Sequence, residues 1–143
     1  MVSLGLFLFL ATSCVAQVKI TIPERRYGKR DEIHAKIENA GSRPVTFCSS
    51  FEGVGEITPS PFWVQRSSNG KWSTLLLGTD VGNDARMADV LTAGKSIEFL
   101  LRVNISGRMR LRLNYWRGSI PNLDCHAPPK DLKLVTSDIF TIE

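Results

Sequence analysis

Apolar and polar side chains alternate along most of this sequence from Gln17 onward, most regularly between Arg108 and Trp116. A period of two places the two sets on opposite faces of a β-strand, whereas helical spacing would mix them. The stretch therefore predicts a strand with one buried face and one exposed face. The expected inward residues are Met109, Leu111, Leu113 and Tyr115, and the expected outward residues are Arg108, Arg110, Arg112 and Asn114.

Seven further stretches show a strand pattern. They cover residues 18–22, 33–38, 45–48, 62–66, 71–76, 96–103 and 132–142. Asn69-Gly70 between two of them is a strong hairpin signal, because both residues accept positive φ. The expected inward residues of the last two stretches are Ile97, Phe99, Leu101, Val103, Phe140 and Ile142.

Seven to eight short strands separated by Gly- and Pro-containing turns favour an all-β fold without βαβ units. The chain has 143 residues, with 43% hydrophobic and 22% charged side chains, which suits one globular domain. We therefore predict a single immunoglobulin-like antiparallel β-sandwich over residues 17–143.

Four turn motifs follow one another along residues 31–143. They are Asn39-Ala40-Gly41-Ser42-Arg43-Pro44-Val45, Ser68-Asn69-Gly70-Lys71-Trp72, Leu91-Thr92-Ala93-Gly94-Lys95-Ser96 and Gly107-Arg108-Met109-Arg110-Leu111. In kind and order they resemble the turns of small bacterial immunoglobulin-like domain proteins. Ala93 stands where the family pattern has Pro, and Met109 where it has an aromatic residue. The layout is also similar to that of the bacterial intracellular proteinase inhibitor family, which shares the sandwich. The resemblance implies the fold, and no inhibitory loop motif carries the inhibitor activity over.

The first sixteen residues differ from the rest of the chain. Met1 to Ala16 has no charged side chain, and an apolar run at Leu4–Leu10 is followed by small residues. This order predicts a secretory signal peptide over residues 1–16, and the run is too short to span a membrane. In an alternative interpretation, Leu10-Ala11-Thr12-Ser13-Cys14 is a lipobox, Cys14 is lipidated, and the product is a membrane-anchored lipoprotein. A third is a buried N-terminal strand or helix of a cytosolic protein.

Export would leave an even pair of cysteines. Cys14 is then removed or acylated, and Cys48 and Cys125 remain in an oxidising compartment, periplasmic or extracellular. We predict a disulfide between them. Two free or merely buried thiols are the alternative.

Catalytic and metal-binding patterns are weak in this sequence. His34 and His126 are its two histidines, and no nucleophile motif such as GxSxG accompanies them. Cys125-His126 lacks the ligand spacing of a zinc site, and the acidic loop Gly78–Asp84 lacks the order of an EF-hand. We expect no catalytic residue, no cofactor and no metal, and hence no enzyme.

The outward arginines are the most suggestive surface feature. Side chains two positions apart on a strand are about 7 Å apart, so Arg108, Arg110 and Arg112 should form a row. We expect Arg102, on the preceding strand, to join them if the hairpin loop between the two strands holds five residues. Such a row suits carboxylate-rich partners or anionic lipid head groups. Alternatively, acids such as Glu98 or Asp138 neutralise it.

These observations predict an exported, non-enzymatic binding or structural module that acts through a sheet face or loops. Its expected partner is a protein or an envelope component, with membrane contact only if Cys14 is lipidated. A formal charge of +4 is too small to indicate nucleic acid. An exposed tryptophan among Trp63, Trp72 and Trp116 could anchor the partner. The alternative function is a proteinase-inhibitor-like protein that inserts loops from one end of the sandwich into a protease cleft.

Overall fold

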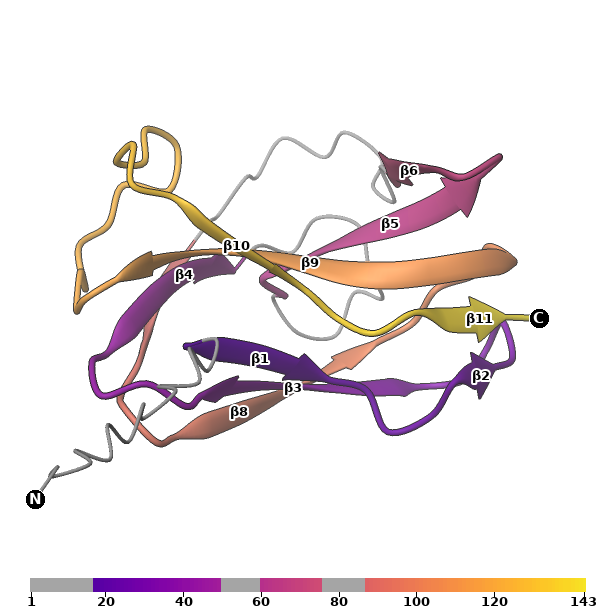
Figure 1. Ribbon diagram of the computed structural model, residues 1–143, viewed down its shortest axis with the longest axis horizontal. Helices are drawn as coiled ribbons and strands as arrows, with labels where there is room; N and C mark the ends of the chain where they lie inside the picture. Colours follow the sequence, from indigo (N-terminus) through magenta and orange to yellow (C-terminus); the bar gives the residue numbers. More distant parts are fainter. Residues whose placement is uncertain (1–16, 50–59, 76–86) are drawn as a thin grey trace, which may run out of the picture.

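Two β-sheets lie face to face in the computed structural model, which describes residues 17–49, 60–75 and 87–143 (Figure 1). The predicted signal peptide, Cys14 and the acidic loop 78–84 lie outside these residues. Within the described ranges, no helix is long and apolar enough to cross a membrane.

The first sheet has three antiparallel strands in the order β1-β3-β8. They are β1 (Val18–Thr21), β3 (Ile33–Asn39) and β8 (Ser96–Leu101). The second sheet follows the order β2-β11-β9-β4-β7, with β10 and β5 also paired to β9, and β6 beside β5. Its strands are β2 (Arg26–Tyr27), β4 (Val45–Ser49), β5 (Phe62–Ser68), β6 (Lys71–Thr74), β7 (Met87–Leu91), β9 (Gly107–Arg117), β10 (Lys133–Thr136) and β11 (Phe140–Ile142).

Strand β9 is the axis of the second sheet. It pairs with β5 and then β4 along one edge, through residues 109–113 and 115–117. Along the other edge it pairs with β11 and then β10, through residues 107–109 and 112–115. Strands from four separate parts of the chain are therefore held in register by this one segment.

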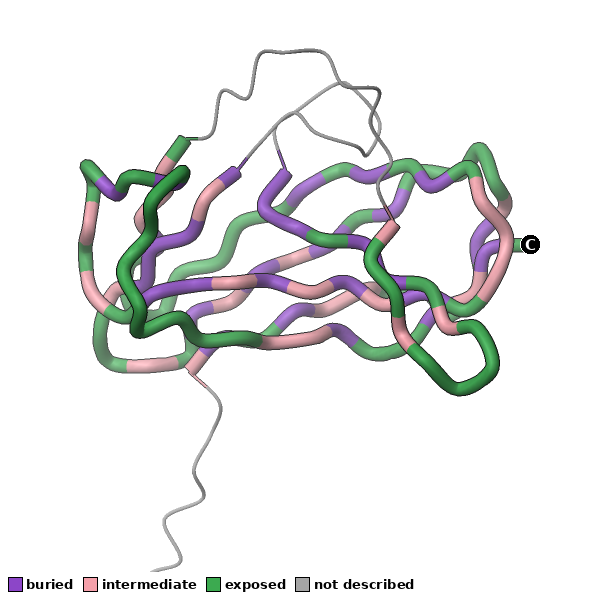
Figure 2. Tube along the Cα trace, turned by 90° about the horizontal axis from the view of Figure 1, so that it is seen from above, coloured by how far each residue is buried: buried purple, intermediate pink, exposed green. Residues whose placement is uncertain are grey.

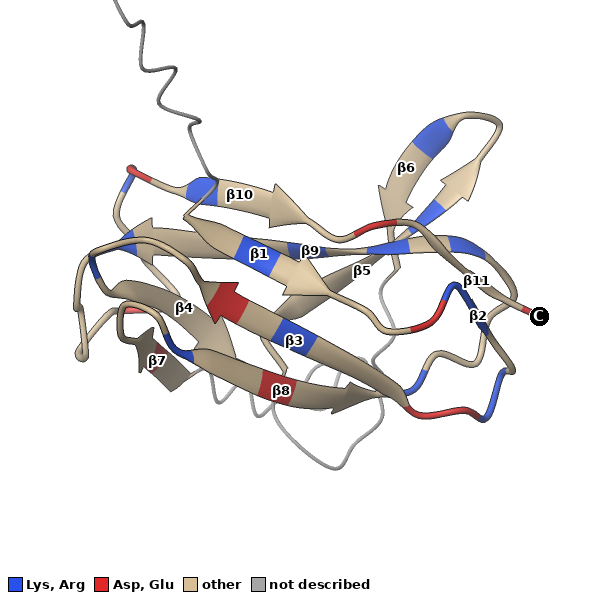
Figure 3. Ribbon diagram, turned by 60° about the horizontal axis from the view of Figure 1, so that its bottom comes forward, with Lys and Arg blue, Asp and Glu red and all other residues tan. Residues whose placement is uncertain are grey.

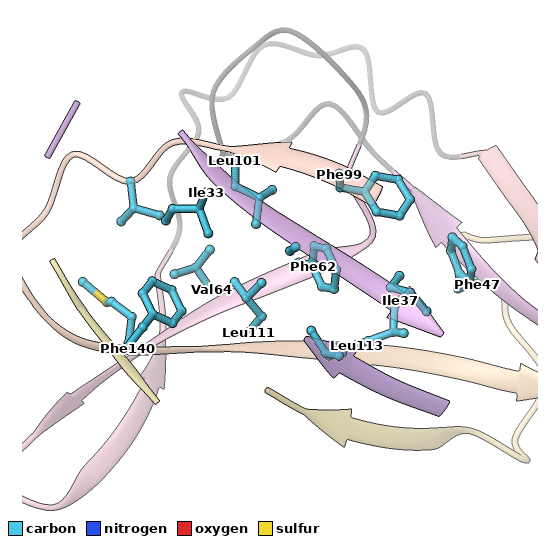
Figure 4. Close-up of a cluster of buried hydrophobic side chains, with 14 of the residues drawn as sticks. Ile33, Ile37, Phe47, Phe62, Val64, Phe99, Leu101, Leu111, Leu113 and Phe140 are labelled. Atoms are coloured by element: carbon cyan, nitrogen blue, oxygen red, sulfur yellow. The ribbon is translucent and has the colours of Figure 1, made fainter. Parts of the chain in front are cut away.

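The core lies between the sheets and contains the inward side chains predicted for β9. Figure 2 shows the buried positions alternating with half-buried and exposed ones along the strands. Phe99 packs edge-on against Phe47 and Phe62, with ring centroids 6.2 and 5.6 Å apart (Figure 4). Tyr27 packs edge-on against Phe140. Burial of the Tyr27 phenol raises its pKa above the ordinary value of 10.0. The other fully buried large side chains include Ile33, Ile37, Leu101, Met109, Leu111, Leu113 and Ile142.

The structure confirms the immunoglobulin-like sandwich, with differences in detail. Eleven strands are present in the described residues, because residues 132–142 divide into β10 and β11 and short strands such as β2 and β7 add to the total. The two-residue β2 pairs with β11 in parallel, whereas the other pairings are antiparallel. The prediction that Ile97 is buried is wrong: it is 39% exposed. Ile97 lies near the beginning of β8, an edge strand of the three-stranded sheet, so among the described strands none pairs with the free edge of β8 beside it.

The predicted hairpin at Asn69-Gly70 is present. Ser68 pairs with Lys71, and the two turn residues between them have φ values of 50° and 75°. Two consecutive positive φ values are those of a type I′ turn, whose twist matches that of the flanking strands. The turn thereby fixes the register of β6 against β5.

Asn39 ties the end of the first sheet to the second. Its side chain is fully buried, and its Nδ2 donates hydrogen bonds to the carbonyl oxygens of Arg43 at 2.8 Å and Leu91 at 3.0 Å. Its Oδ1 accepts a hydrogen bond from the amide of Gly41 at 3.1 Å. One side chain therefore closes the turn between β3 and β4 and also holds the end of β7.

We expect Asn39→Asp to lower the free energy of unfolding by about 3 kcal/mol or more, because the carbonyl oxygens of Arg43 and Leu91 lose their donor and a carboxylate takes its place at a fully buried site. Urea unfolding monitored by circular dichroism measures this. Asn69→Asp is the matched control, since Asp-Gly suits the same hairpin turn and the site is exposed. Equal midpoints for the two variants would contradict the role given to Asn39.

Candidate binding surface

The outward side of β9 carries the predicted row of arginines, which we call the arginine row (Arg108, Arg110 and Arg112). Arg108 is exposed, while Arg110 and Arg112 are half-buried between strands on both sides. Figure 3 shows the basic segments following one another along β9. The alternation in the sequence thus places the row correctly.

Arg102 does not join the row. It follows β8, which pairs with β3 in the first sheet and not with β9. Its guanidinium binds the Glu32 carboxylate at 2.6 Å. The expectation that β8 and β9 form a hairpin is wrong, because the connection between them passes from one sheet to the other.

The two acids that could have neutralised the row are engaged elsewhere. Glu98 contacts His34 Nδ1 at 2.8 Å on the outer face of the first sheet, and Asp138 binds Arg25 at 3.0 Å. Within the described parts of the chain, no carboxylate lies within 4.0 Å of the arginine row. The carboxylates of the described residues therefore leave the positive charge of the row unneutralised.

Arg110 is held in place by a polar contact and an aromatic one. Its Nε donates a hydrogen bond to Gln65 Oε1 at 2.8 Å, and its guanidinium carbon lies 4.3 Å from the centre of the Trp72 ring. A cation over an indole face at this distance is stabilised by about 0.5–1 kcal/mol at exposed sites. The Asn-Gly hairpin positions Trp72, so it also orients this arginine.

Arg112 is held by a longer hydrogen bond than Arg110. Its Nε donates a hydrogen bond to Asn114 Oδ1 at 3.3 Å, two residues along the same face. Trp63 on β5 is its register partner, so the two side chains lie next to each other on the outer face. Trp63 is 38% exposed, and it is the exposed tryptophan that the sequence left unassigned.

The Cys48–Cys125 disulfide is present in the structure, with the two Cα atoms 5.9 Å apart. It holds the segment 118–132 against the outer side of the second sheet, away from the main core. Trp116, Leu123 and Cys125 form a separate buried cluster there. The indole N–H of Trp116 donates a hydrogen bond to the carbonyl oxygen of Pro129 at 3.0 Å, which anchors the far end of the segment.

A cavity of about 140 Å³ lies beside this bond, and we call it the disulfide cavity. Its walls come from four separate parts of the chain: Cys48 of β4, residues 60–63, Asn114 and Trp116 of β9, and the disulfide-held segment. The apolar walls include Pro61, Trp63, Trp116, Pro128 and Leu132, and Ser60 and Asn114 supply polar groups. No pattern in the sequence indicates the cavity, because its walls meet only after segment 118–132 folds back.

The two histidines lie apart in the fold. His34 belongs to the first sheet, while His126 follows Cys125 in segment 118–132, where its backbone amide donates a hydrogen bond to Asp124 Oδ1 at 3.0 Å. No group of three His, Cys, Asp or Glu side chains in the described ranges is arranged to hold a metal ion. The surface instead combines fixed cations, an exposed indole and a small cavity, which are features of binding sites.

Comparisons with known proteins add little to this description. No family model matches the chain, and no similar curated protein was found. Among solved structures, the ASH/PapD-like domain of human CEP192 (PapD-like domain 7) aligns with 100% of this chain and 96% of its own, at 11% identity and a TM-score of 0.36. So distant a likeness supports no functional argument. The strands and sheets of the chain itself make it an all-β immunoglobulin-like sandwich.

We expect the double variant Cys48→Ala/Cys125→Ala to lose about 2–5 kcal/mol of stability, because the bond closes a loop across 77 residues. Urea unfolding of the oxidised wild type and the variant measures the difference. Reduced wild type should match the variant.

Peptide mapping after alkylation checks the pairing directly. In the unreduced full chain, Cys48 and Cys125 should remain unlabelled. A label on either residue without reduction would contradict the disulfide.

Proposed function

We propose that this protein is a non-enzymatic binding module that works outside the cytoplasm and recognises an acidic segment of a protein partner through the outer face of its second sheet. The arginine row is the observation that carries this proposal. Arg102 and Arg25 are paired with carboxylates, whereas the three arginines of the row lack such partners among the described residues. Guanidinium groups bind carboxylates through paired hydrogen bonds, so the row offers unused binding capacity.

The spacing of the row supports an extended peptide as the ligand. Alternate residues of a strand are about 7 Å apart, both in β9 and in an extended partner segment. Acidic side chains at every second position of such a segment would therefore meet successive arginines. Arg110 is already oriented by Gln65 and Trp72, which reduces the entropy lost on binding.

The disulfide supports the proposed location. Disulfides persist in oxidising compartments and are rare in the cytosol. The Cys48–Cys125 disulfide holds segment 118–132, which forms part of the candidate binding surface. A binding surface that depends on a disulfide suits a protein that works in the periplasm or outside the cell.

We expect Arg108→Gln/Arg110→Gln/Arg112→Gln to weaken binding to fluorescein-labelled poly-L-glutamate at least about tenfold at low ionic strength, since each lost contact is charge-assisted. Fluorescence anisotropy measures the affinity, and thermal unfolding verifies that the variant is folded.

A second triple variant removes the same formal charge elsewhere. Arg25, Arg26 and Arg102 each contact a carboxylate, at 3.0, 3.5 and 2.6 Å respectively. Their replacement by Gln should change poly-L-glutamate binding much less. Equal losses in the two triple variants would show that overall charge, and not the arginine row, controls binding.

The proteinase-inhibitor-like alternative remains a separate hypothesis that rests on the resemblance in layout. A panel of serine and cysteine proteases distinguishes it from the proposal. Micromolar inhibition that survives substitution of the arginine row would favour the inhibitor.

A further inference from the structure

We infer that the disulfide cavity receives one aromatic side chain of the bound acidic segment, and that Arg112 pairs with the acidic residue two positions away from it. This inference rests on the proposed function and specifies the ligand: an extended segment with an aromatic residue followed, at alternate positions, by carboxylates. Three observations support it, namely the size of the cavity, its walls and its position at the end of the arginine row.

The size of the cavity limits what it can hold. A cavity of 150 Å³ in an engineered protein binds benzene, whereas pockets for drug-sized ligands begin at about 300 Å³. The disulfide cavity, at about 140 Å³, therefore matches a single phenyl ring and is too small for a whole cofactor.

The walls of the cavity suit an aromatic ring. Trp63 and Trp116 offer indole surfaces, and Pro61, Pro128 and Leu132 add apolar contacts. Trp116 is only 5% exposed and is fixed by its hydrogen bond to Pro129, so this part of the wall is rigid. A rigid apolar wall favours insertion of a side chain, because little order has to be gained on binding.

The position of the cavity connects it to the arginine row. Asn114 lines the cavity and accepts the hydrogen bond from Arg112 Nε, while Trp63 lines it and is the register partner of Arg112. Arg112 is therefore the first cation beyond the cavity, and Arg110 is the next, about 7 Å further along β9. An aromatic residue in the cavity thus places the following alternate residues of an extended segment opposite these two arginines.

The test uses the full chain with its disulfide intact and the blocked peptide acetyl-Glu-Ser-Glu-Ser-Phe-Ser-Glu-Ser-Glu-amide. This peptide is symmetric in sequence about its Phe, so it can bind in either direction along the row. A second peptide has Ala in place of Phe. We expect the Phe peptide to bind at least about tenfold more tightly than the Ala peptide, the ratio that corresponds to burial of a phenyl group. NMR titration should show the indole N–H signal of Trp116 shifting with the Phe peptide only, whereas that of Trp63, which lies beside Arg112, should shift with both peptides.

Two exposed leucines provide matched variants that leave the core intact. Leu132 lines the cavity and is 41% exposed, whereas Leu134 is 51% exposed and does not line it. Leu132→Ala should reduce the preference for Phe over Ala severalfold, and Leu134→Ala should leave it unchanged. Arg112→Gln should weaken both peptides alike, since its partner is the carboxylate.

The outcomes separate this inference from the proposed function. Equal affinities for the Phe and Ala peptides, both abolished by removing the arginine row, would overturn the cavity inference and leave the acidic-segment proposal standing. Tight binding of neither peptide would overturn both. A preference for Phe that persists in Leu132→Ala would overturn the assignment of the ring to this cavity.

Discussion

The hydrogen-bonded register of β9 is the constraint on which the rest of the molecule depends. Because the strand pairs with β5 and β4 on one edge and with β11 and β10 on the other, its eleven residues position most of the second sheet. A shift of one residue would turn every side chain to the opposite face. It would bring Arg110 into the core and Leu111 into the solvent, so core burial and the placement of the arginine row are two results of one register.

The outer side of the second sheet has two parts with different construction. In the exposed part, the residues that hold Arg110 in place are close together in the sequence. Gln65 and Trp72 come from β5 and β6, which one Asn-Gly turn joins. Near Trp116, the cover is the distant segment 118–132, which a disulfide and one indole hydrogen bond hold down. The disulfide cavity lies where these two parts meet. A binding surface therefore arises here from a long-range covalent bond placed next to a short-range hairpin.

The sequence predicts the local features of this structure well and the long-range ones less well. The alternation in β9 and the Asn69-Gly70 turn depend on neighbouring residues, and the structure confirms both. The expectation for Arg102 depends on a hairpin between consecutive strands, whereas β8 and β9 belong to different sheets. Which sheet a strand joins is decided by the packing of the whole core, which a period of two does not encode. The sequence pattern does not indicate the cavity for the same reason, since its walls come from four separate parts of the chain.

Electrostatic repulsion within the arginine row is small enough for the fold to tolerate. Two unit charges about 7 Å apart in water repel by about 0.6 kcal/mol, and physiological salt, with a screening length of about 8 Å, lowers this further. The buried contacts of Met109, Leu111 and Leu113 beneath the row contribute more than that, at about 1.5–3 kcal/mol for each fully buried side chain. The core can therefore carry three arginines that no carboxylate of the described residues neutralises, on the reverse face of the same strand. A partner that supplies carboxylates would relieve this repulsion and gain charge-assisted hydrogen bonds, so the electrostatic cost of the row in the free protein favours binding.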